Sequence, residues 1–496
     1  MRKFEELAGG LMMIGIEGNK VTPSIRKLVK TVRPGGVIFF RPNFSSAASF
    51  RRLVSGLEKN AGKKLLTAVD HEGGRVIHLA NTTVFPDNLV LGNTGKESYA
   101  RRQGNVEARE LRNLGILMNL APTVDVLGDN YSPNIGIRSY GKNPDLVSKL
   151  GTARIKAMQN NGAAACAKHF PGQGHSSLDA HLDLPVLSSP SDEIEKIHLK
   201  PFRAAIAAGV EAVMSSHPIY PQMDGSSNPA TFSREIIYDL LRVKMKFEGL
   251  ILTDDLEMGA LKNLCSIGES ACRAVEAGHD MVLVCHDPKN VIKVYESLVA
   301  GFESGRLNAW ELEKSLVRIE NLKKKYSAKS GAVVKAGMLP DKICAEGVKR
   351  LKSHAGFRFK RGDDVTLIFP RLVDLASRIY IEREMFDVEK FLKQLCLKNG
   401  LKCRKVITSG IIASVRDIDE AENIDGHVIY FCYDAHMDPN AVRILNRLPR
   451  AVRKAAVVFM RNPYDSKFAD RRISAVQSFG FRVCQIKAAL KLLVSK

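Results

Sequence analysis

The sequence has 496 residues, of which 45% are hydrophobic and 26% are charged. These values are typical of a folded protein with a sizeable core, and the length predicts two or more domains. The net charge is +21, but the basic residues are scattered and lack the interleaved aromatic residues of single-strand binders. We therefore expect no nucleic-acid partner; the positive surplus suits an anionic substrate instead.

The first residues do not resemble a signal peptide, because Glu5 and Glu6 interrupt the basic start and the following apolar run is short. No apolar run is long enough to cross a bilayer, so no membrane partner is expected. The nine cysteines form no C-x-x-C pair, which indicates reduced thiols. A cytoplasmic location is the prediction.

Short apolar runs recur along the first two-thirds of the chain, with helical patterns such as 49–60 and 198–209 between them. Uniformly apolar strands that alternate with helices indicate a parallel sheet covered by helices. Eight such units in about 330 residues predict a (β/α)₈ TIM-type barrel, with a doubly wound open sheet as the alternative. The predicted strands are 11–16, 35–40, 65–70, 117–126, 163–170, 211–218, 249–255 and 280–286.

A second, smaller α/β domain is predicted at the C-terminal end. A helical pattern closes the barrel at 308–326, and 327–341 has the composition of a linker. New strand patterns follow at 365–370, 427–434 and 455–460, with a helix at 388–400. The predicted organisation is a catalytic barrel at 1–326, a linker at 327–341 and a C-terminal α/β sandwich domain at 342–496.

Polar residues cluster at the ends of the predicted barrel strands. In a barrel these ends gather at one mouth, where active sites lie. Placement after five different strands is hard to explain by solubility alone. The residues are Asp70, Lys168, His169, His217, Asp254, Asp255 and His286.

The segment KHFPGQGHSSLDAHLDLP, which starts at Lys168, is open to three interpretations. A zinc site would use His175, Asp179 and His181, but no H-E-x-x-H motif or cysteine pair supports it, so neither a metal nor another cofactor is expected. The glycine pattern completes neither phosphate-binding fingerprint. The third interpretation pairs Asp179 with His181, so that the carboxylate orients the imidazole for acid–base chemistry.

A D-x-H pair alone is a weak signal for catalysis. It becomes informative if a second carboxylate lies across the barrel mouth, and Asp254 at the end of a strand is the candidate. The alternative is that Asp254 or Asp255 caps the following helix. Asp70 is placed to hydrogen-bond a ligand hydroxyl, and Glu72 to pair with Arg75. Arg138 lies in the glycine-containing segment 134–141 and is a candidate site residue, with an ordinary surface arginine as the alternative. The segment 227–233 is expected to be a structural turn without a catalytic role.

With these segments in hand, the chain resembles glycoside hydrolase family 3, in its β-N-acetylglucosaminidase branch. The resemblance rests on DHEGGRV, IGIRSYG, KHFPGQGHSSLDAH, NPATFS and LTDDLEM, which occur in the order of the family and span about the first 330 residues. It implies a barrel fold and, in two-domain members, a C-terminal α/β sandwich.

The resemblance also implies roles for individual residues. Asp254 would be the nucleophile that forms a glycosyl-enzyme intermediate, and His181 the general acid/base with Asp179 as its dyad partner. Asp70, Arg138, Lys168 and His169 would bind the substrate according to the resemblance. His217 is added as a substrate-binding residue because it follows a predicted barrel strand.

Three positions depart from the pattern of the family. Gln173 stands where a second histidine is usual, His175 where an aspartate is usual, and His78 where many members have a second arginine. The first two are expected to support the loop rather than take part in the chemistry.

The predicted function is a retaining, exo-acting β-N-acetylglucosaminidase that hydrolyses terminal N-acetylglucosamine, with cell-wall muropeptide fragments as the substrate class. The alternatives are a β-glucosidase or xylosidase of the same family, an N-acetylglucosaminide phosphorylase, and a catalytically inactive carbohydrate-binding protein.

Overall fold

The computed structural model describes residues 2–129, 131–176, 184–327, 334–422 and 424–495. Its N-terminal part is a closed barrel of eight parallel strands, in the order β1-β10-β9-β8-β7-β6-β3-β2. All eight predicted barrel strands are confirmed, and the open-sheet alternative is wrong. The strands are β1 (Met12–Ile14), β2 (Gly36–Phe39), β3 (Leu66–Val69), β6 (Met118–Asn119), β7 (Ala164–Phe170), β8 (Ala212–Ser215), β9 (Leu250–Asp255) and β10 (Met281–Val284).

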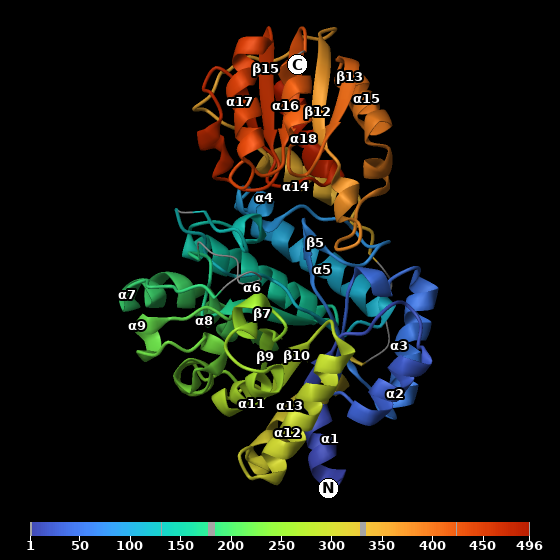
Figure 1. The fold of residues 1–496 in the computed structure, drawn as a ribbon, viewed down its shortest axis with the longest axis vertical. Helices are drawn as coiled ribbons and strands as arrows, with labels where there is room; N and C mark the ends of the chain where they lie inside the picture. The colour runs from blue at the N-terminus through green and yellow to red at the C-terminus, as the bar shows by residue number, and fades with distance from the viewer. Residues whose placement is uncertain (1, 130, 177–183, 328–333, 423, 496) are drawn as a thin grey trace.

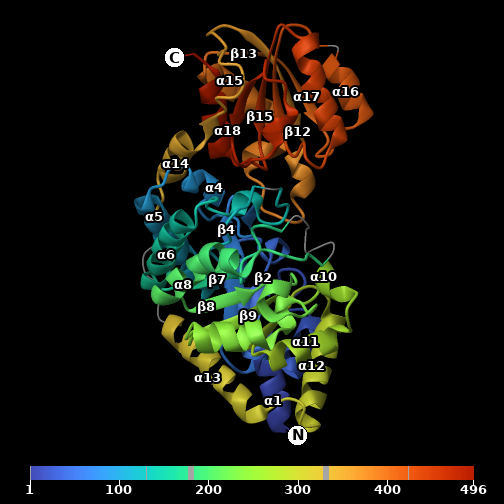
Figure 2. The ribbon, with the colours of Figure 1, turned by 90° about the vertical axis from the view of Figure 1, so that its left-hand side faces the viewer.

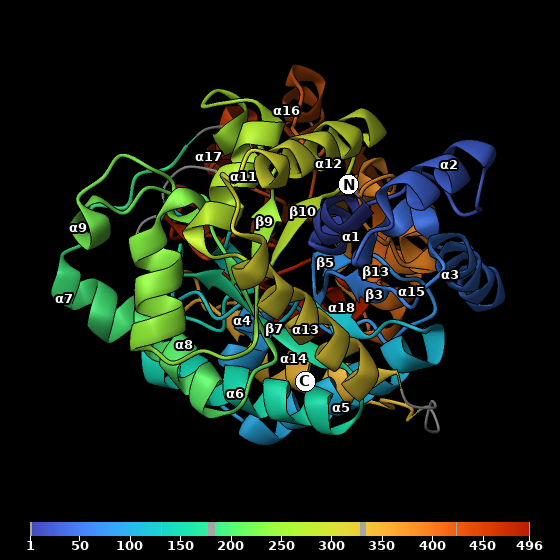
Figure 3. The ribbon, with the colours of Figure 1, turned by 90° about the horizontal axis from the view of Figure 1, so that it is seen from below.

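Helices surround the barrel, as the view along the molecule in Figure 3 shows. The predicted helices at 49–60 and 308–326 are α3 and α13. The main covering helices are α1 (Arg2–Gly10), α2 (Pro23–Val32), α3 (Ala47–Ala61), α5 (Glu97–Leu114), α6 (Pro144–Asn160), α8 (Leu199–Ala207), α11 (Ile267–Ala277), α12 (Pro288–Glu303) and α13 (Ala309–Tyr326).

The barrel has an apolar interior because alternate strand residues point inward. In β1, Met13 joins the inner core, whereas Met12 and Ile14 pack outward against the helices. The same alternation operates in the other strands, as expected where side chains change face at every residue. The inner core contains Ile38, Leu66, Ala68, Met118, Leu120, Ala164, Cys166, Met214, Leu250, Leu252, Met281 and Leu283.

A second sheet forms the C-terminal part, drawn in orange and red in Figure 1. Its strand order is β11-β16-β15-β14-β12-β13, and only the β11–β16 pair is antiparallel. The strands are β11 (Lys349–Arg350), β12 (Asp364–Pro370), β13 (Lys402–Ser409), β14 (His427–Cys432), β15 (Lys454–Phe459) and β16 (Ser474–Gln477).

Alternate residues of this sheet pack into two separate cores, which makes the predicted α/β sandwich. Ile368 and Val428 share one core with α17 (Pro439–Ala451). Leu367 and Ile429 share the other with α15 (Val388–Lys398) and α18 (Val483–Leu493).

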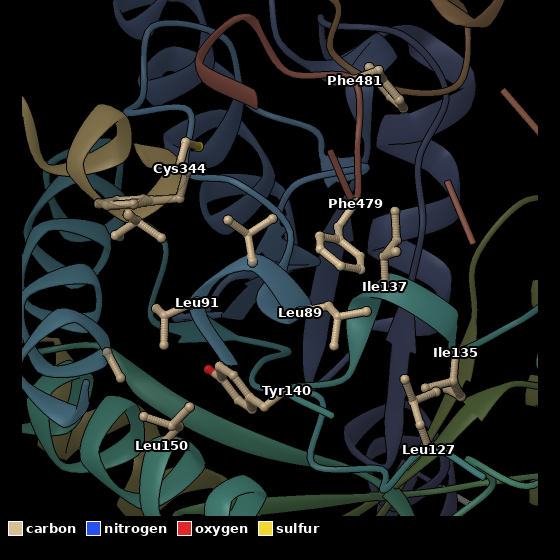
Figure 4. Packing of buried hydrophobic residues seen from close by; sticks show 14 of the residues in the cluster. Leu89, Leu91, Leu127, Ile135, Ile137, Tyr140, Leu150, Cys344, Phe479 and Phe481 are labelled. Carbon is tan, nitrogen blue, oxygen red and sulfur yellow. The ribbon is translucent and has the colours of Figure 1, made fainter. Parts of the chain in front are cut away.

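The C-terminal sheet lies at the end of the barrel opposite the N-terminus, next to the short helix α4 (Asn88–Gly92) (Figures 1 and 2). One hydrophobic cluster runs across the contact: Figure 4 shows Phe479 directed toward Leu89 and Ile137. Arg482 adds polar contacts, donating from Nε to the Gly74 carbonyl at 2.6 Å.

Helical structure after the barrel resumes at Leu339. Helix α14 (Leu339–Gly347) starts inside 327–341, because Pro340 stands in the first turn, where a missing N–H costs no helical hydrogen bond. Among the described residues, no helix is both long and apolar enough for a membrane crossing.

Candidate active site

Three polar side chains extend the inward-facing rows of the barrel strands by one further step. Leu66 and Ala68 point inward, and Asp70 follows two residues later. Lys168 continues the row of Ala164 and Cys166 in β7, and Asp254 continues the row of Leu250 and Leu252 in β9. Because side chains alternate along a strand, all three are directed to the mouth of the barrel.

These residues line a cavity of about 670 Å³ above the apolar core. The C-terminal domain reaches it as well, through Ser377 and Arg378. The other lining residues include Phe40, Asp70, Glu72, Arg75, His78, Asn134, Arg138, Lys168, His169, Asp254, Cys285 and His286. Of the predicted substrate-binding residues, the structure brings Asp70, Arg138, Lys168 and His169 together here.

Buried ion pairs hold the cationic side of the cavity. Lys168 pairs with Asp70 and, at 2.8 Å, with Glu72. Arg138 donates two parallel hydrogen bonds to the Glu72 carboxylate, from Nη2 at 2.7 Å and from Nε at 2.9 Å. The geometry is the bidentate one that guanidinium and carboxylate favour. The sequence interpretation that paired Glu72 with Arg75 is therefore wrong.

These contacts shift the pKa values of the buried groups. Burial opposes charge on Glu72, but Arg138 and Lys168 outweigh it and hold the pKa of Glu72 well below its usual value. Burial likewise opposes charge on Lys168, while Asp70 and Glu72 raise its pKa. Glu72 and Lys168 are both charged near neutral pH.

Asp125 orients His169 and the start of the loop that follows β7. The carboxylate contacts His169 Nδ1 at 2.7 Å and accepts a hydrogen bond from the His169 backbone N–H. Its other oxygen accepts from the Gln173 N–H at 2.7 Å. The sequence analysis did not single out Asp125; the signal was a lone carboxylate inside the apolar run 117–126, which requires a buried partner.

Deeper residues fix the segment that carries Glu72. Arg154 is fully buried, forms an ion pair with Glu107, and donates from Nη2 to the Glu72 carbonyl at 2.8 Å. Because its donors are already used by protein partners, this buried arginine holds the backbone at Glu72 in place and does not bind a ligand.

Asp254 lies on the cavity wall, with its carboxylate accepting a hydrogen bond from the Asp255 N–H at 2.8 Å. Burial alone would raise the pKa of Asp254, but the electrostatic influence of His169, His217 and Lys168 outweighs burial and lowers it. The carboxylate is thus ionised near neutral pH.

Asp255 differs from its neighbour. Burial raises its pKa to about 7, and the hydrogen bond from the Glu257 N–H and the contact with the Cys285 side chain only partly offset this effect. Neither aspartate side chain caps a helix in the manner the alternative interpretation required: the hydrogen bond from Glu257 joins residues two apart in a turn.

His217 is 1% exposed and is not among the residues that line the cavity. Its Nε2 donates to the Asp255 carbonyl at 3.0 Å, and its Nδ1 contacts Thr231 Oγ1 at 2.7 Å. This position favours support of the Asp254–Asp255 segment over direct contact with a ligand. Thr231 belongs to the segment 227–233, expected to be structural.

The predicted acid/base His181 and its partner Asp179 lie outside the described residues. The chain is described up to Ser176, and Gly174 shows why this stretch needs glycine: a Cβ there would lie 1.9 Å from the Val126 carbonyl oxygen. His78, one departure from the family pattern, is 9% exposed at the cavity edge, and its ring meets Phe40 edge-on at 5.4 Å.

Comparison with known proteins identifies the family of the chain. Residues 4–322 match the model of the glycosyl hydrolase family 3 N-terminal domain. A β-hexosaminidase of Nitrosomonas eutropha is 36% identical over 296 residues, 58% of this chain and 84% of that protein. A β-hexosaminidase of Neisseria gonorrhoeae is 32% identical over 351 residues, 68% of this chain and 96% of that protein.

Among solved structures, a glycoside hydrolase family 3 β-N-acetylglucosaminidase from Paenibacillus sp. str. FPU-7 superposes with a TM-score of 0.90 at 29% identity. The match covers 99% of this chain and 97% of the other. Both parts of the fold are therefore shared. Barrel, cavity and family match lead to one conclusion: the chain is a glycoside hydrolase and belongs to glycosyl hydrolase family 3.

Proposed function

We propose that this chain is a retaining, exo-acting β-N-acetylglucosaminidase that removes terminal N-acetylglucosamine from anionic oligosaccharides such as cell-wall muropeptide fragments. Asp254 is the nucleophile, His181 the general acid/base and Asp179 the partner that orients His181. A cytoplasmic location would fit this role.

The observation that carries the proposal is the position of Asp254. An ionised carboxylate at the end of β9 lines the cavity together with Asp70, Lys168, His169 and Arg138. In retaining glycosidases, one group attacks the anomeric carbon while a second group, on the other side of the glycosidic bond, protonates the leaving oxygen. An ionised Asp254 meets the first requirement, and neighbouring carboxylate, ammonium and imidazole groups are suited to bind sugar hydroxyls.

The acid/base role falls to His181 because an imidazole both donates and accepts a proton near neutral pH. It would first protonate the departing oxygen and then, neutral, take a proton from the incoming water.

Two arginines support an anionic aglycone. Arg75 and Arg378 line the cavity, and no ion pair of either side chain is found among the described residues. The names of the two curated relatives and of the Paenibacillus structure agree with an N-acetylhexosamine as the sugar removed.

The test measures which anomer of the sugar is released first and which sugar the enzyme prefers. With p-nitrophenyl β-N-acetylglucosaminide, we expect the β-anomer of the sugar as the first product by ¹H NMR, and little turnover of the glucoside. A 5-fluoro analogue should leave one sugar on the peptide that carries Asp254, with Asp254→Asn as the unlabelled control. First appearance of the α-anomer would contradict retention, and sugar 1-phosphate formed in phosphate buffer would replace hydrolysis with phosphorolysis.

A further inference from the structure

Three side chains near the barrel mouth form a cluster that the glycosidase reaction does not use. His175, Glu193 and His198 each present one ligand atom, and these atoms all lie within 4.8 Å of one another. His175 Nδ1 is 3.0 Å from Glu193 Oε1, and His198 Nε2 is 3.9 Å from the same oxygen. The two imidazole rings are nearly perpendicular, with centroids 4.3 Å apart.

His198 supplies a second, independent observation. It is 2% exposed, and in the described part of the chain neither of its ring nitrogens has a hydrogen-bond partner. A buried polar atom without a partner costs about 1–3 kcal/mol. Nδ1 is turned toward Gly172, where a Cβ would lie 3.3 Å from it, so Nε2 is the atom directed at Glu193 and His175.

We propose that His175, Glu193 and His198 bind one divalent transition-metal ion of the Zn²⁺ type. Two imidazoles and a carboxylate are a donor set that suits Zn²⁺ and its neighbours rather than Mg²⁺ or Ca²⁺, which prefer oxygen ligands. Tetrahedral coordination needs ligand atoms about 3.3 Å apart, given metal–ligand bonds of about 2.0–2.2 Å. The Glu193 side chain is 32% exposed, so it can rotate to close the wider distances, and water can complete the coordination.

The ligands differ from those considered from sequence, where His175 was grouped with Asp179 and His181. They come from both sides of the segment 177–183: His175 precedes it, whereas Glu193 and His198 follow it on the helical turns α7 (Ser191–Glu193) and η3 (Ile194–His198). The metal would therefore cross-link the two chain ends that flank Asp179 and His181. Any effect on turnover rests on the proposed function, whereas metal binding does not.

The experiment measures metal binding directly on the full chain after treatment with EDTA. Equilibrium dialysis against Zn²⁺ alone, with metal analysis, should give one tightly bound ion per chain. Co²⁺ alone should give visible d–d absorption without the charge-transfer band of thiolate ligation. Glu193→Gln and His175→Gln should each weaken binding by more than about 100-fold, beyond the 10–100-fold typical of residues that only contact ligands.

Two control variants test whether loss of Zn²⁺ binding is specific to the three proposed ligands. Glu195→Gln removes the same charge two positions after Glu193, at a residue of η3 that pairs with Arg203 at the surface, and this variant should bind Zn²⁺ like the parent. His181→Gln should also retain the ion, which separates this site from binding at the proposed acid/base. The proposal is overturned if the parent binds neither ion, or if Glu193→Gln and His175→Gln bind Zn²⁺ as tightly as the parent.

Discussion

Glu72 and Lys168 form a buried ion pair of 2.8 Å, although Lys168 lies in β7 and Glu72 in a short strand that follows β3. Glu72 at the same time holds Arg138 in a bidentate contact. One carboxylate thus fixes two cations on the wall of the cavity, and each cation is a proposed contact for the sugar. Ion pairs within the protein itself therefore hold the proposed sugar-binding side of the cavity.

Replacing Glu72 by glutamine should leave Arg138 without its buried carboxylate partner and Lys168 with Asp70 alone. Removal of one member of a buried ion pair costs about 3–5 kcal/mol, so the free energy of unfolding should fall by that order in urea titrations. The kcat/KM for p-nitrophenyl N-acetylglucosaminide should drop at least about ten-fold, equivalent to 1.4 kcal/mol of lost stabilisation.

Glu97→Gln is the matched control for Glu72→Gln. It breaks an exposed pair with Arg101, also of 2.8 Å, and should cost less than about 1 kcal/mol. Equal losses of stability in the two variants would show that the Glu72 pairs do not support the cavity wall.

Asp255 should make the stability of the protein depend on pH. Its folded-state pKa is about 7, above the value of about 3.9 for an unfolded chain, so the folded state binds the extra proton between these values. The contribution of this group to stability is complete below pH 4 and is lost as the pH rises toward 7. The unfolding free energy of Asp255→Asn minus that of the parent should therefore increase from pH 4.5 to pH 7.5.

The difference between variant and parent isolates Asp255 from other buried acids with raised pKa values, such as Asp87 and Asp465, because these titrate in both proteins. Urea titrations at four or five pH values are sufficient. A difference that stays constant across this range would mean that Asp255 is already ionised below pH 5.

Arg378 should help to bind an anionic aglycone from the side of the C-terminal domain. Arg378→Ala should raise KM about two- to five-fold for a substrate with a carboxylate in the aglycone, the range of an exposed charge pair of up to about 1 kcal/mol. KM for the neutral aryl glycoside should not change. The effect should shrink at high salt, since exposed charges are screened.

Arg383→Ala removes an equal charge from an exposed residue that is not among the cavity-lining residues. It should leave both KM values unchanged. An identical rise in the two arginine variants would point to net charge as the cause, not to a contact at the cavity.

The sequence predicted the barrel well because its strands are buried on both faces. Such strands read as continuous apolar runs, and a polar residue at the end of a run then marks the mouth of the barrel, as Asp70, Lys168 and Asp254 do. Strand β13 was not predicted because KCRKVITS lies at the edge of its sheet, where charged side chains reach solvent.

Partners that are distant in sequence could not be predicted in this way. Glu72 was paired with Arg75 because they are three positions apart, but the hairpin of β4 (His71–Gly73) and β5 (Val76–Ile77) separates them. Which cation contacts Glu72 depends on how β4, β7 and the segment that carries Arg138 come together in the folded barrel. The same holds for Arg378, which reaches the cavity only through docking of the C-terminal domain.

The roles of His181 and Asp254 should separate when the leaving group is varied. An acid catalyst matters most when the departing oxygen is strongly basic, so His181→Ala should slow cleavage of an alkyl N-acetylglucosaminide or a disaccharide by about 10²–10⁴-fold. A 2,4-dinitrophenyl glycoside leaves without protonation and should form the glycosyl-enzyme at nearly the parent rate, which a burst of dinitrophenol in rapid mixing would show. Asp254→Ala lacks the proposed attacking carboxylate and should lose both activities. If His181→Ala loses both substrates equally, the residue does not act as the acid, and the proton must come from another group at the barrel mouth.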